Sequence, residues 1–479
     1  MEFEVFIFVS LGVAWGLAFG VIPTAGPTTA LLTSYVFFPY FYSDPYLGVA
    51  FYTAMVAACA TGDTWSSILL GIPGSSSSAA TVLDGYPLAK KGKATYALSA
   101  AFTSSTINGL LFGSLVFLLM PIYGKLLLIF GIPELLMLNI LALTCVVFLV
   151  KGNIRLGIVS ILLGFLLGYI GIDENNAPRL TFGYTYLEDG INVLILVSGL
   201  FAVPEIVDMF LKNNQLQKLN SSWRQVVLGI LAWKKYWFIS LRGGMIGALV
   251  GALPGVHGIV ADWLSYAQTK FSLPKRKFGN GNIAGVVGPE GANNAVTAAS
   301  FVPTVVFGIP GTPFTAVILS LFYLLHFDLG SVSIQQDSEF YKYLTIGFLG
   351  GTVLVGISCL LLSKPITLLL RIPVKVYAPL ILLLIGWSCY QISHTYYDIA
   401  TLVVCAAIGL TSKRLELNRP AILLAFILFA KIEALSYQTM SLYNITTLIE
   451  RPITIVLFVL TLVTIVAGLK YVETNRSYK

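Results

Sequence analysis

With 57% hydrophobic and only 11% charged residues over 479 positions, the chain has less than half of the roughly 25% charged residues of a soluble domain, which excludes a soluble globular enzyme. The net charge of +7 is small for this length; it excludes a nucleic-acid-binding surface and is typical of membrane orientation signals. The five cysteines form no CxxC pair, so we expect neither disulfides nor a metal site. We predict an all-α polytopic membrane protein.

Long apolar runs follow one another along the chain, and each is long enough, or nearly so, to cross a bilayer. They begin at Phe3, Tyr46, Tyr96, Glu134, Leu156, Ile191, Tyr236, Ile283, Tyr341, Val376, Ala400, Ala421 and Ile453. Two shorter crossings, interrupted by Gly and Pro, follow Pro23 and Pro254. We therefore predict about fifteen crossings of the membrane.

The charged loops predict the orientation of these crossings. Basic residues cluster in segments that the positive-inside rule places in the cytoplasm: Lys90 to Lys93, Lys151 to Arg155, Lys212 to Lys235, Lys270 to Lys277, Lys364 to Lys375, and Lys413 with Arg414. The acidic connections between them are predicted to lie outside, and Lys125 and Arg179 oppose this assignment. The alternation places the N-terminus outside and the C-terminus in the cytoplasm.

The sequence contains an internal repeat. Gly20–Pro23 recurs as Gly251–Pro254, and Gly71–Gly74 recurs as Gly308–Gly311 at nearly the same displacement along the chain. Two further anchors keep the same order: Ser34-Tyr35 with Ser265-Tyr266, and Ile132-Pro133 with Ile372-Pro373. Four anchors in one order indicate two copies of one structural unit.

The charges of equivalent loops predict that the two copies are inverted. The loop after the first Gly-Ile-Pro-Gly motif contains Lys90, Lys91 and Lys93, whereas the loop after the second leads to Asp328 and Asp337. Inverted repeats with broken helices in matching positions are typical of secondary transporters, whose site lies near the midplane. An alternative is that the Gly and Pro residues only kink or pack the helices.

The predicted fold has two inverted-topology repeats with Gly/Pro-broken helices or re-entrant hairpins, plus an extra C-terminal helix. The expected domains are 1–211, a first transmembrane repeat; 212–235, a cytoplasmic amphipathic linker; 236–435, a second transmembrane repeat; and 436–479, a C-terminal helix and tail. The expected breaks are at Gly20, Pro23, Gly26, Pro27, Gly71, Pro73, Gly74, Gly251, Pro254, Gly308, Pro310 and Gly311.

The broken segments supply the candidate substrate-binding residues. A restarted helix aims its free N–H groups and positive dipole end at the cavity, which favours a carboxylate. Small and hydroxyl residues at capping positions indicate such restarts, and nearby amides would orient the anion. The predicted substrate-binding residues are Thr28, Thr29, Ser75, Ser76, Asn293, Asn294 and Thr312. Each of them could instead bond its own helix or cap it.

Ionisable residues inside the apolar segments are candidate ion-coupling residues. Asp63 and Glu290 are predicted to couple transport to Na⁺ or H⁺, although Asp63 could be a locally bonded buried acid. For Asp262 and His257 a structural role is the favoured interpretation. The chain lacks nucleophile, zinc and P-loop motifs, so we expect no enzyme activity, no catalytic residues, no cofactor, and no metal other than Na⁺.

Three stretches resemble TctA, the large membrane subunit of tripartite tricarboxylate transporters. They are GVIPTAGPTTALL from Gly20, LLGIPGSSSSAATVLDGYPLAKKGKATYAL from Leu69, and GALPGVHG from Gly251, continuing through GPEGANNAVTAASFVPTVVFGIPGTP to Pro313. The segments that match the family's motifs are Pro23 to Thr29, Gly71 to Ser76, Glu290, Asn293, Asn294 and Gly308 to Thr312. Asp63 and the surroundings of His257 depart from the family pattern, so the substrate need not be a tricarboxylate.

The resemblance implies a permease of the prokaryotic cytoplasmic membrane. It implies as partners a small four-helix membrane subunit (TctB-like) and a periplasmic solute-binding protein (TctC-like), besides membrane lipid and the organic anion. Our hypothesis is a cation-coupled secondary transporter that imports a carboxylate. The alternatives are an anion channel or a stand-alone carboxylate carrier; an intramembrane hydrolase would need a nucleophile and base that the sequence does not show.

Overall fold

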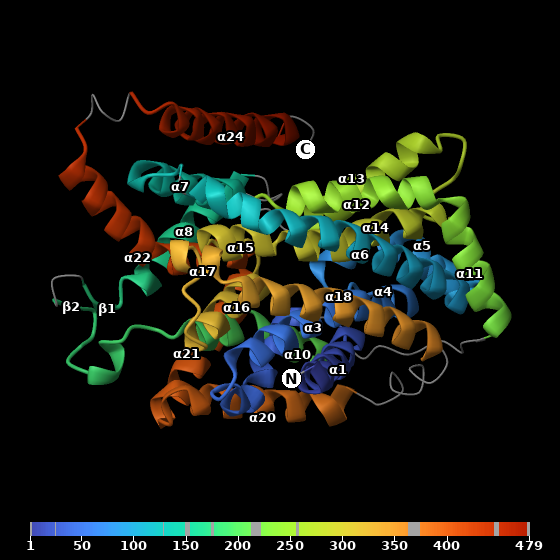
Figure 1. Cartoon of the computed structure of the whole chain (residues 1–479), viewed down its shortest axis with the longest axis horizontal. Helices are drawn as coiled ribbons and strands as arrows, with labels where there is room; N and C mark the ends of the chain where they lie inside the picture. Colours follow the sequence, from blue (N-terminus) through green and yellow to red (C-terminus); the bar gives the residue numbers. More distant parts are fainter. Residues whose placement is uncertain are drawn as a thin grey trace.

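Helices make up most of the computed structural model, which describes residues 2–23, 25–127, 129–148, 154–173, 177–211, 222–254, 258–362, 374–444 and 450–476 (Figure 1). The strands within these ranges form one short antiparallel hairpin, in which Gly171 is paired with Arg179. The prediction of an all-α polytopic membrane protein is therefore confirmed.

The first half of the chain contains short helices wherever the sequence breaks an apolar run. Its elements are α1 (Glu2–Val21), α2 (Gly26–Thr33), η1 (Ser34–Phe41), α3 (Pro45–Gly62), α4 (Thr64–Leu69), η2 (Ser76–Ser78), α5 (Thr81–Lys90), α6 (Ala94–Leu127), α7 (Ile132–Phe148), α8 (Ile154–Gly168), β1 (Gly171–Ile172), β2 (Pro178–Arg179), η3 (Thr185–Leu187), α9 (Val193–Val197), η4 (Ser198–Ala202) and α10 (Val203–Leu211).

The second half likewise contains long helices together with short helices at breaks in its apolar runs. Its elements are α11 (Trp223–Lys235), α12 (Trp237–Gly251), α13 (Gly258–Ser272), α14 (Ala284–Ala299), α15 (Phe301–Phe307), α16 (Pro313–Leu324), α17 (Val332–Gln336), α18 (Ser338–Leu361), α20 (Val374–Ser393), α21 (Tyr396–Arg414), α22 (Arg419–Leu442) and α24 (Pro452–Arg476).

Within the described residues, six helical segments are long and apolar enough to cross a membrane: Phe3–Val21, Pro45–Leu69, Ala94–Ile122, Ser338–Leu361, Lys375–Ser393 and Arg419–Leu442. Five shorter apolar helices are Ile132–Cys145, Arg155–Gly168, Trp237–Gly251, Pro313–Leu324 and Pro452–Val466. The apolar runs from Ile191, Ile283 and Ala400 also form helices, but these are too short or too polar to count as spans. The number of crossings stays a prediction.

The same helix packing occurs in both halves of the chain, on stripes of glycine. In α1, Gly12, Gly16 and Gly20 face the backbone oxygens of Phe51, Met55 and Cys59 in α3. In α12, Gly243, Gly247 and Gly251 face those of Gly288, Ala292 and Val296 in α14. Gly16 and Gly247 are separated by the same number of residues as Gly20 and Gly251. Met55 and Ala292 are separated by the same number of residues as Gly71 and Gly308. The two helix pairs are therefore structural equivalents.

The two halves also pack on each other in a reciprocal way. Helix α18 of the second half lies against α3 of the first, with Gly347 and Gly351 facing Ala50 and Ala54. Helix α6 of the first half lies against α14 of the second, with Gly109 facing Asn294. In Figure 1, α6, α12 and α14 run alongside one another above, and α18, α3 and α1 lie below. Such an exchange is expected for two copies related by a two-fold axis.

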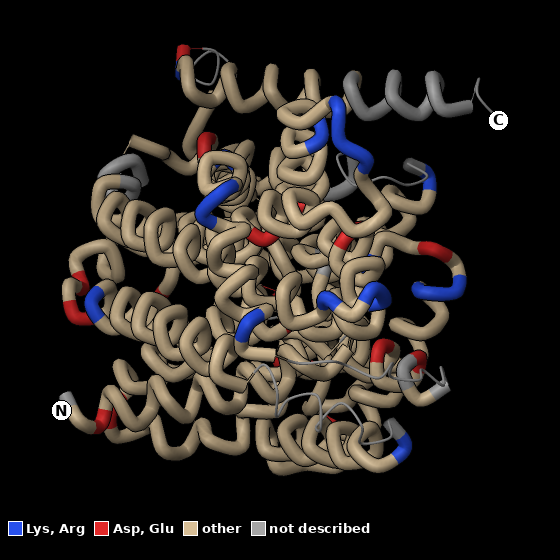
Figure 2. Tube along the Cα trace, turned by 90° about the vertical axis from the view of Figure 1, so that its right-hand side faces the viewer, with Lys and Arg blue, Asp and Glu red and all other residues tan. Residues whose placement is uncertain are grey.

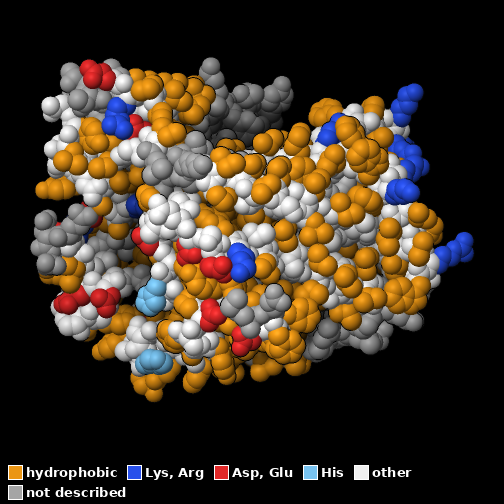
Figure 3. Space-filling model, viewed as in Figure 1, with side chains coloured by type: hydrophobic (Ala, Val, Ile, Leu, Met, Phe, Trp, Pro, Cys, Tyr) orange, Lys and Arg blue, Asp and Glu red, His pale blue; other side chains and the backbone are white. Residues whose placement is uncertain are grey.

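Charged side chains are unevenly distributed over the surface. Figure 3 shows Lys and Arg gathered at the right-hand edge, where Figure 1 places α11 and the end of α5. Figure 2 turns this side of the molecule towards the viewer. Arg179, which opposed the predicted orientation, pairs with Asp173 at 3.0 Å and with Glu433 at 2.8 Å, so its charge is neutralised locally.

Candidate functional site

A cavity of about 450 Å³ lies between the broken segments of the two halves. It is lined by residues of α2 and the loop before it, of α3, of the loop and short helix around Ser75, and of α13, α14, α16 and their ends: Ala25 to Thr29, Ala60, Pro73 to Ser75, Ser77, Ala79, Gly258, Ile259, Val296, Thr297, Ser300 and Thr312 to Phe314. Phe201, Glu205 and Pro420 complete the wall. The cavity thus joins segments that lie far apart in the sequence.

Equivalent positions of the two copies line this cavity. Thr28 corresponds to Ile259 in the register that relates Gly20 to Gly251, and both line the wall. Ser75 corresponds to Thr312 in the register that relates the two Gly-Ile-Pro-Gly motifs, and both line it as well. The cavity therefore lies where the two repeats meet.

The two Gly-Ile-Pro-Gly motifs end in the same local structure. Gly71 and Gly308 have φ of +70° and +62°, which glycine adopts without strain. Ser75 and Thr312 then cap the helices that follow, with φ of −141° and −142°. Each takes part in a capping box, with Ser78 and Thr315 respectively. These hydroxyl caps fix where both restarted helices begin.

The N-terminal residues of three helices line the cavity. Helix α2 starts at Gly26 and Pro27 with no side-chain cap, and its first residues line the wall. The Thr28 hydroxyl has no hydrogen-bond partner within the described part of the chain. The first residues of α13 and α16 line the same cavity. N–H groups left free at helix starts form a natural site for an anion.

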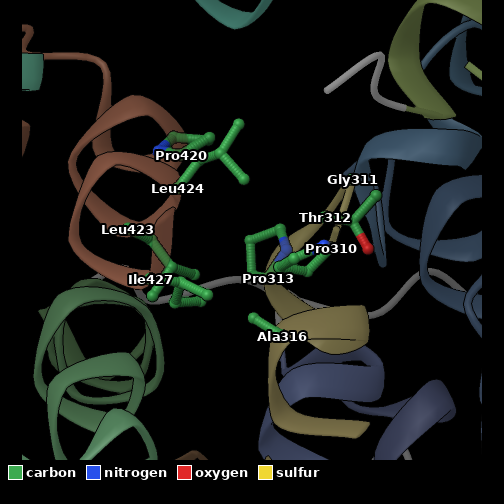
Figure 4. Close-up of a pocket in the computed structure, with 9 residues that line it drawn as sticks. All are labelled: Pro310, Gly311, Thr312, Pro313, Ala316, Pro420, Leu423, Leu424 and Ile427. Carbon is green, nitrogen blue, oxygen red and sulfur yellow. The ribbon is translucent and has the colours of Figure 1, made fainter. Parts of the chain in front are cut away.

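The start of α16 separates the cavity from an apolar contact with α22. Figure 4 shows Thr312 with its side-chain oxygen turned away from Leu423, Leu424 and Ile427 of α22. The gap between α16 and α22 has a volume of only about 10 Å³, which is too small for an organic anion. The polar side of this helix start therefore belongs to the larger cavity.

Asp63 lies at the junction of α3 and α4, fully buried behind the cavity wall. Its carboxylate accepts hydrogen bonds from Ser75 Oγ and from Asn293 Nδ2, the latter at 3.2 Å. Ser77 Oγ donates to Asn293 Oδ1 at 2.8 Å and lies 2.9 Å from Ser75 Oγ. The structure thus brings Asp63 and Ser75 of the first copy together with Asn293 of the second.

Glu290 is buried in α14 beside this cluster. Its carboxylate accepts hydrogen bonds from Thr64 Oγ1 at 2.9 Å and Thr81 Oγ1 at 2.8 Å. Asn294 Nδ2 donates to Thr61 Oγ1 at 2.8 Å, while its Oδ1 atom is buried without a partner. Neither Glu290 nor Asn294 lines the cavity, so both act, at most, behind its wall.

Three buried carboxylates therefore lie around the cavity: Asp63, Glu290 and Asp262. Asp262 accepts a hydrogen bond from the Ala80 N–H at 2.6 Å, and its other oxygen has no partner. None of the three forms an ion pair with Lys or Arg in the described ranges. A buried carboxylate is costly unless a proton or a cation neutralises it.

Sequence reasoning missed the charged wall of the cavity. Glu205 of α10 lines it and pairs with Arg419 at 2.8 Å and Lys413 at 2.9 Å. Lys413 also pairs with Asp208 at 2.6 Å. Pro204 lies in the first turn of α10, where proline does not break a helix, so nothing local connected this segment with the broken ones.

A second residue missed by sequence reasoning is Asp84. It is fully buried in α5 and accepts hydrogen bonds from the N–H groups of Gly279, Gly281 and Asn282 at 2.9, 2.9 and 2.8 Å. Tyr266 donates its hydroxyl to the same carboxylate at 3.0 Å. Asp84 thus fastens α5 of the first half to a loop of the second and is a structural residue.

The remaining predicted positions differ in their placement. Thr28, Thr29, Ser75 and Thr312 line the cavity. The side chain of Ser76 and all of His257 lie outside the described residues. Gly20 and Gly251, expected as breaks, are still helical, because the chain leaves the helix only after them; they serve close packing instead.

Two similarly packed halves with interrupted helices around a shared cavity make this a polytopic membrane protein whose architecture resembles that of secondary transporters. The chain belongs to the tripartite tricarboxylate transporter TctA family, whose sequence model matches residues 6–424. It is 30% identical over 437 residues, 88% of this chain and 84% of the other, to an uncharacterized 52.8 kDa protein in the TAR-I ttuC' 3' region of Agrobacterium vitis.

A second relative from Agrobacterium vitis is an uncharacterized protein in the TAR-II ttuC' 3' region. It is 31% identical over 227 residues, which are 47% of this chain and 93% of the relative. No solved structure matches this chain.

Proposed function

We propose that this chain is the large permease subunit of a tripartite transporter and that it imports a small organic anion, a carboxylate, together with Na⁺ or H⁺. Family membership supports the assignment to a tripartite tricarboxylate transporter permease. The observation that supports an anionic substrate is the cavity that the first residues of α2, α13 and α16 line. The uncapped start of α2 and the positive dipole ends of the three helices would bind a carboxylate without a fully buried cation.

The coupling ion belongs, in this proposal, to the cluster of Asp63, Ser75, Ser77 and Asn293. Hydroxyl, amide and carboxylate oxygens are ligands that suit a hard cation such as Na⁺; alternatively, Asp63 is protonated. Ser75 connects the two functions, since it lines the cavity and donates to Asp63. A cation or proton at Asp63 would stabilise the cluster and thereby the anion-binding wall.

We propose further that the two repeats are inverted and alternate their exposure of the cavity. Reciprocal packing of α3 on α18 and of α14 on α6 supports a two-fold relation, and the loop charges favour an axis in the membrane plane. The N-terminus is then outside and the C-terminus in the cytoplasm of a prokaryotic cell. A small membrane subunit and a periplasmic solute-binding protein, TctB-like and TctC-like, would complete the transporter.

Uptake into proteoliposomes tests this function. The protein is reconstituted with its membrane subunit, and uptake of carboxylates is measured with and without the binding protein under Na⁺ or pH gradients. We expect saturable uptake that needs the binding protein and a cation gradient. Uptake at the same rate without the binding protein would indicate a stand-alone carrier, and current without saturation or coupling would indicate an anion channel.

The Thr28 hydroxyl is expected to contribute directly to anion binding. Replacement Thr28→Val keeps the shape of the side chain but removes a donor, and a hydrogen bond to a charged group contributes roughly 1.5–3 kcal/mol. The substrate concentration for half-maximal uptake should rise about tenfold or more, whereas Thr28→Ser should stay close to the wild type. Equal effects of both variants would show that the hydroxyl does not take part in anion binding.

Glu205 is expected to weaken anion binding, because its carboxylate lies in the cavity wall. Replacement Glu205→Gln removes this charge and leaves Arg419 and Lys413 in place, so direct binding of the substrate anion should become severalfold tighter, roughly 1 kcal/mol. Asp208→Asn is the control, since Asp208 pairs with the same Lys413 but does not line the cavity. Weaker binding in Glu205→Gln, or an equal change in both variants, would contradict this role.

A further inference from the structure

A basic groove lies apart from the cavity, at the end of the molecule where α11 meets the start of α6. It consists of two adjoining hollows of about 630 and 400 Å³ that share Lys93, Tyr96, Arg276 and Ile283. Figure 3 shows Lys and Arg side chains gathered along this edge. None of these residues belongs to the transport cavity.

The groove has four cationic side chains in its lining and no acidic one: Lys93, Lys235, Arg276 and Lys277. All four are exposed, and none forms an ion pair with a carboxylate in the part of the chain that the structure describes. Asp84, which contacts residues of the groove's 279–282 loop, is buried and already accepts four hydrogen bonds. The positive charge of the groove is therefore not compensated by the protein.

The frame of the groove is fixed by hydrogen bonds between separate elements. Gln225 of α11 donates to Gly92 O at 3.0 Å and accepts from Tyr96 N at 3.4 Å. Lys91 donates to Asn280 O at 2.5 Å, which holds the 279–282 loop against the end of α5. The groove therefore exists without a ligand, and an anion that enters it need not order these elements.

One side of the groove is apolar and open. Leu228 and Leu231 line it and are about half exposed, and Trp237 and Phe238 at the start of α12 are exposed to a similar degree. Basic pockets at the cytoplasmic side of membrane helices with apolar flanks are suited to anionic lipid headgroups, whose acyl chains cover the flank. A soluble anion such as phosphate would use the cations but leave these side chains uncovered.

We propose that this groove binds the phosphate headgroup of an anionic phospholipid of the cytoplasmic leaflet, with its acyl chains along Leu228, Leu231 and Trp237. Lys235 and Arg276 face the headgroup from α11 and from the loop after α13, so a bound lipid links the amphipathic helix α11 to the second half of the protein. This site is independent of the transport cavity.

Lipid binding to matched double variants tests the proposal. The purified full-length protein, in zwitterionic detergent, is titrated with phosphatidylglycerol, phosphatidylcholine or inorganic phosphate, and bound lipid is counted by native mass spectrometry. Lys235→Ala/Arg276→Ala removes two cations of the groove. Lys234→Ala/Lys275→Ala removes two neighbouring exposed cations that do not line it, with the same change in net charge.

We expect the wild type and the Lys234/Lys275 variant to bind phosphatidylglycerol in preference to phosphatidylcholine, and the Lys235/Arg276 variant to lose roughly tenfold or more in apparent affinity. Inorganic phosphate at millimolar concentration should not displace the lipid. Equal losses in both variants, no preference for the anionic lipid, or full displacement by phosphate would overturn the proposal. Thermal unfolding and uptake of each variant show whether it is folded.

Discussion

Asp63→Asn is expected to shift the cation dependence of uptake strongly. The variant keeps the size of the side chain but removes the negative charge that a Na⁺ ion or a proton would neutralise. Because a contact with a charged group contributes roughly 1.5–3 kcal/mol, ion affinity should fall at least about tenfold. Uptake measured over a range of Na⁺ concentrations and of pH reveals the loss, and also which of the two ions couples.

A matched control for this variant is Asp398→Asn. Asp398 is equally buried and accepts hydrogen bonds from Tyr186 OH at 2.9 Å and Ser393 N at 3.2 Å, but it does not line the cavity. Its replacement should leave the ion dependence unchanged. An Asp63→Asn protein that still requires the same ion at the same concentration would exclude Asp63 as the coupling residue.

Gly247→Val is expected to destabilise the protein strongly. A Cβ atom at this position would lie 2.5 Å from Ala292 O and 2.9 Å from Ala292 Cα, both backbone atoms of α14. Overpacking costs about 1–3 kcal/mol, and more where backbone must move, so we expect a loss of about 3 kcal/mol or no folded protein. The measurement is thermal unfolding, with yield after size-exclusion chromatography.

Gly386→Val is the control for this prediction, because a Cβ atom at Gly386 meets no atom within 4 Å. It should fold with nearly unchanged stability. The equivalent position in the first repeat, Gly16, faces Met55 O in the same manner, and Gly16→Val should behave like Gly247→Val. A fully stable Gly247→Val protein would show that close approach of α12 and α14 is not needed for the fold.

Sequence reasoning was most informative where local chemistry decides the structure. Gly71 and Gly308 require a positive φ, and Ser75 and Thr312 cap a helix, so the motif itself dictates the restart. The numbers of residues that separate the copies of two of the recurring motifs also separate the equivalent residues of the two glycine-packed helix pairs. Recurrence along a chain is visible without any knowledge of the contacts.

It was least informative where contacts join distant elements. Glu205 lines the cavity and pairs with Arg419 at the start of α22, which lies 214 residues away in the sequence. Asp84 accepts hydrogen bonds from a loop of the other half that lies 195 to 198 residues away in the sequence. Gly20 was assigned to a break because it opens the recurring Gly20–Pro23 motif, whereas in the structure it packs closely on α3. Local patterns cannot distinguish these uses of an acid or a glycine.

The central claim is that both repeats contribute to one anion-binding cavity, and substrate protection of engineered cysteines tests it most directly. Thr28→Cys and Ile259→Cys place one thiol at each of two equivalent lining positions, in a protein whose five native cysteines are replaced. Exposed Ser43→Cys is the control. We predict that saturating substrate with its cation slows maleimide labelling at both lining positions and not at Ser43; protection of only one, or of neither, would contradict a shared site.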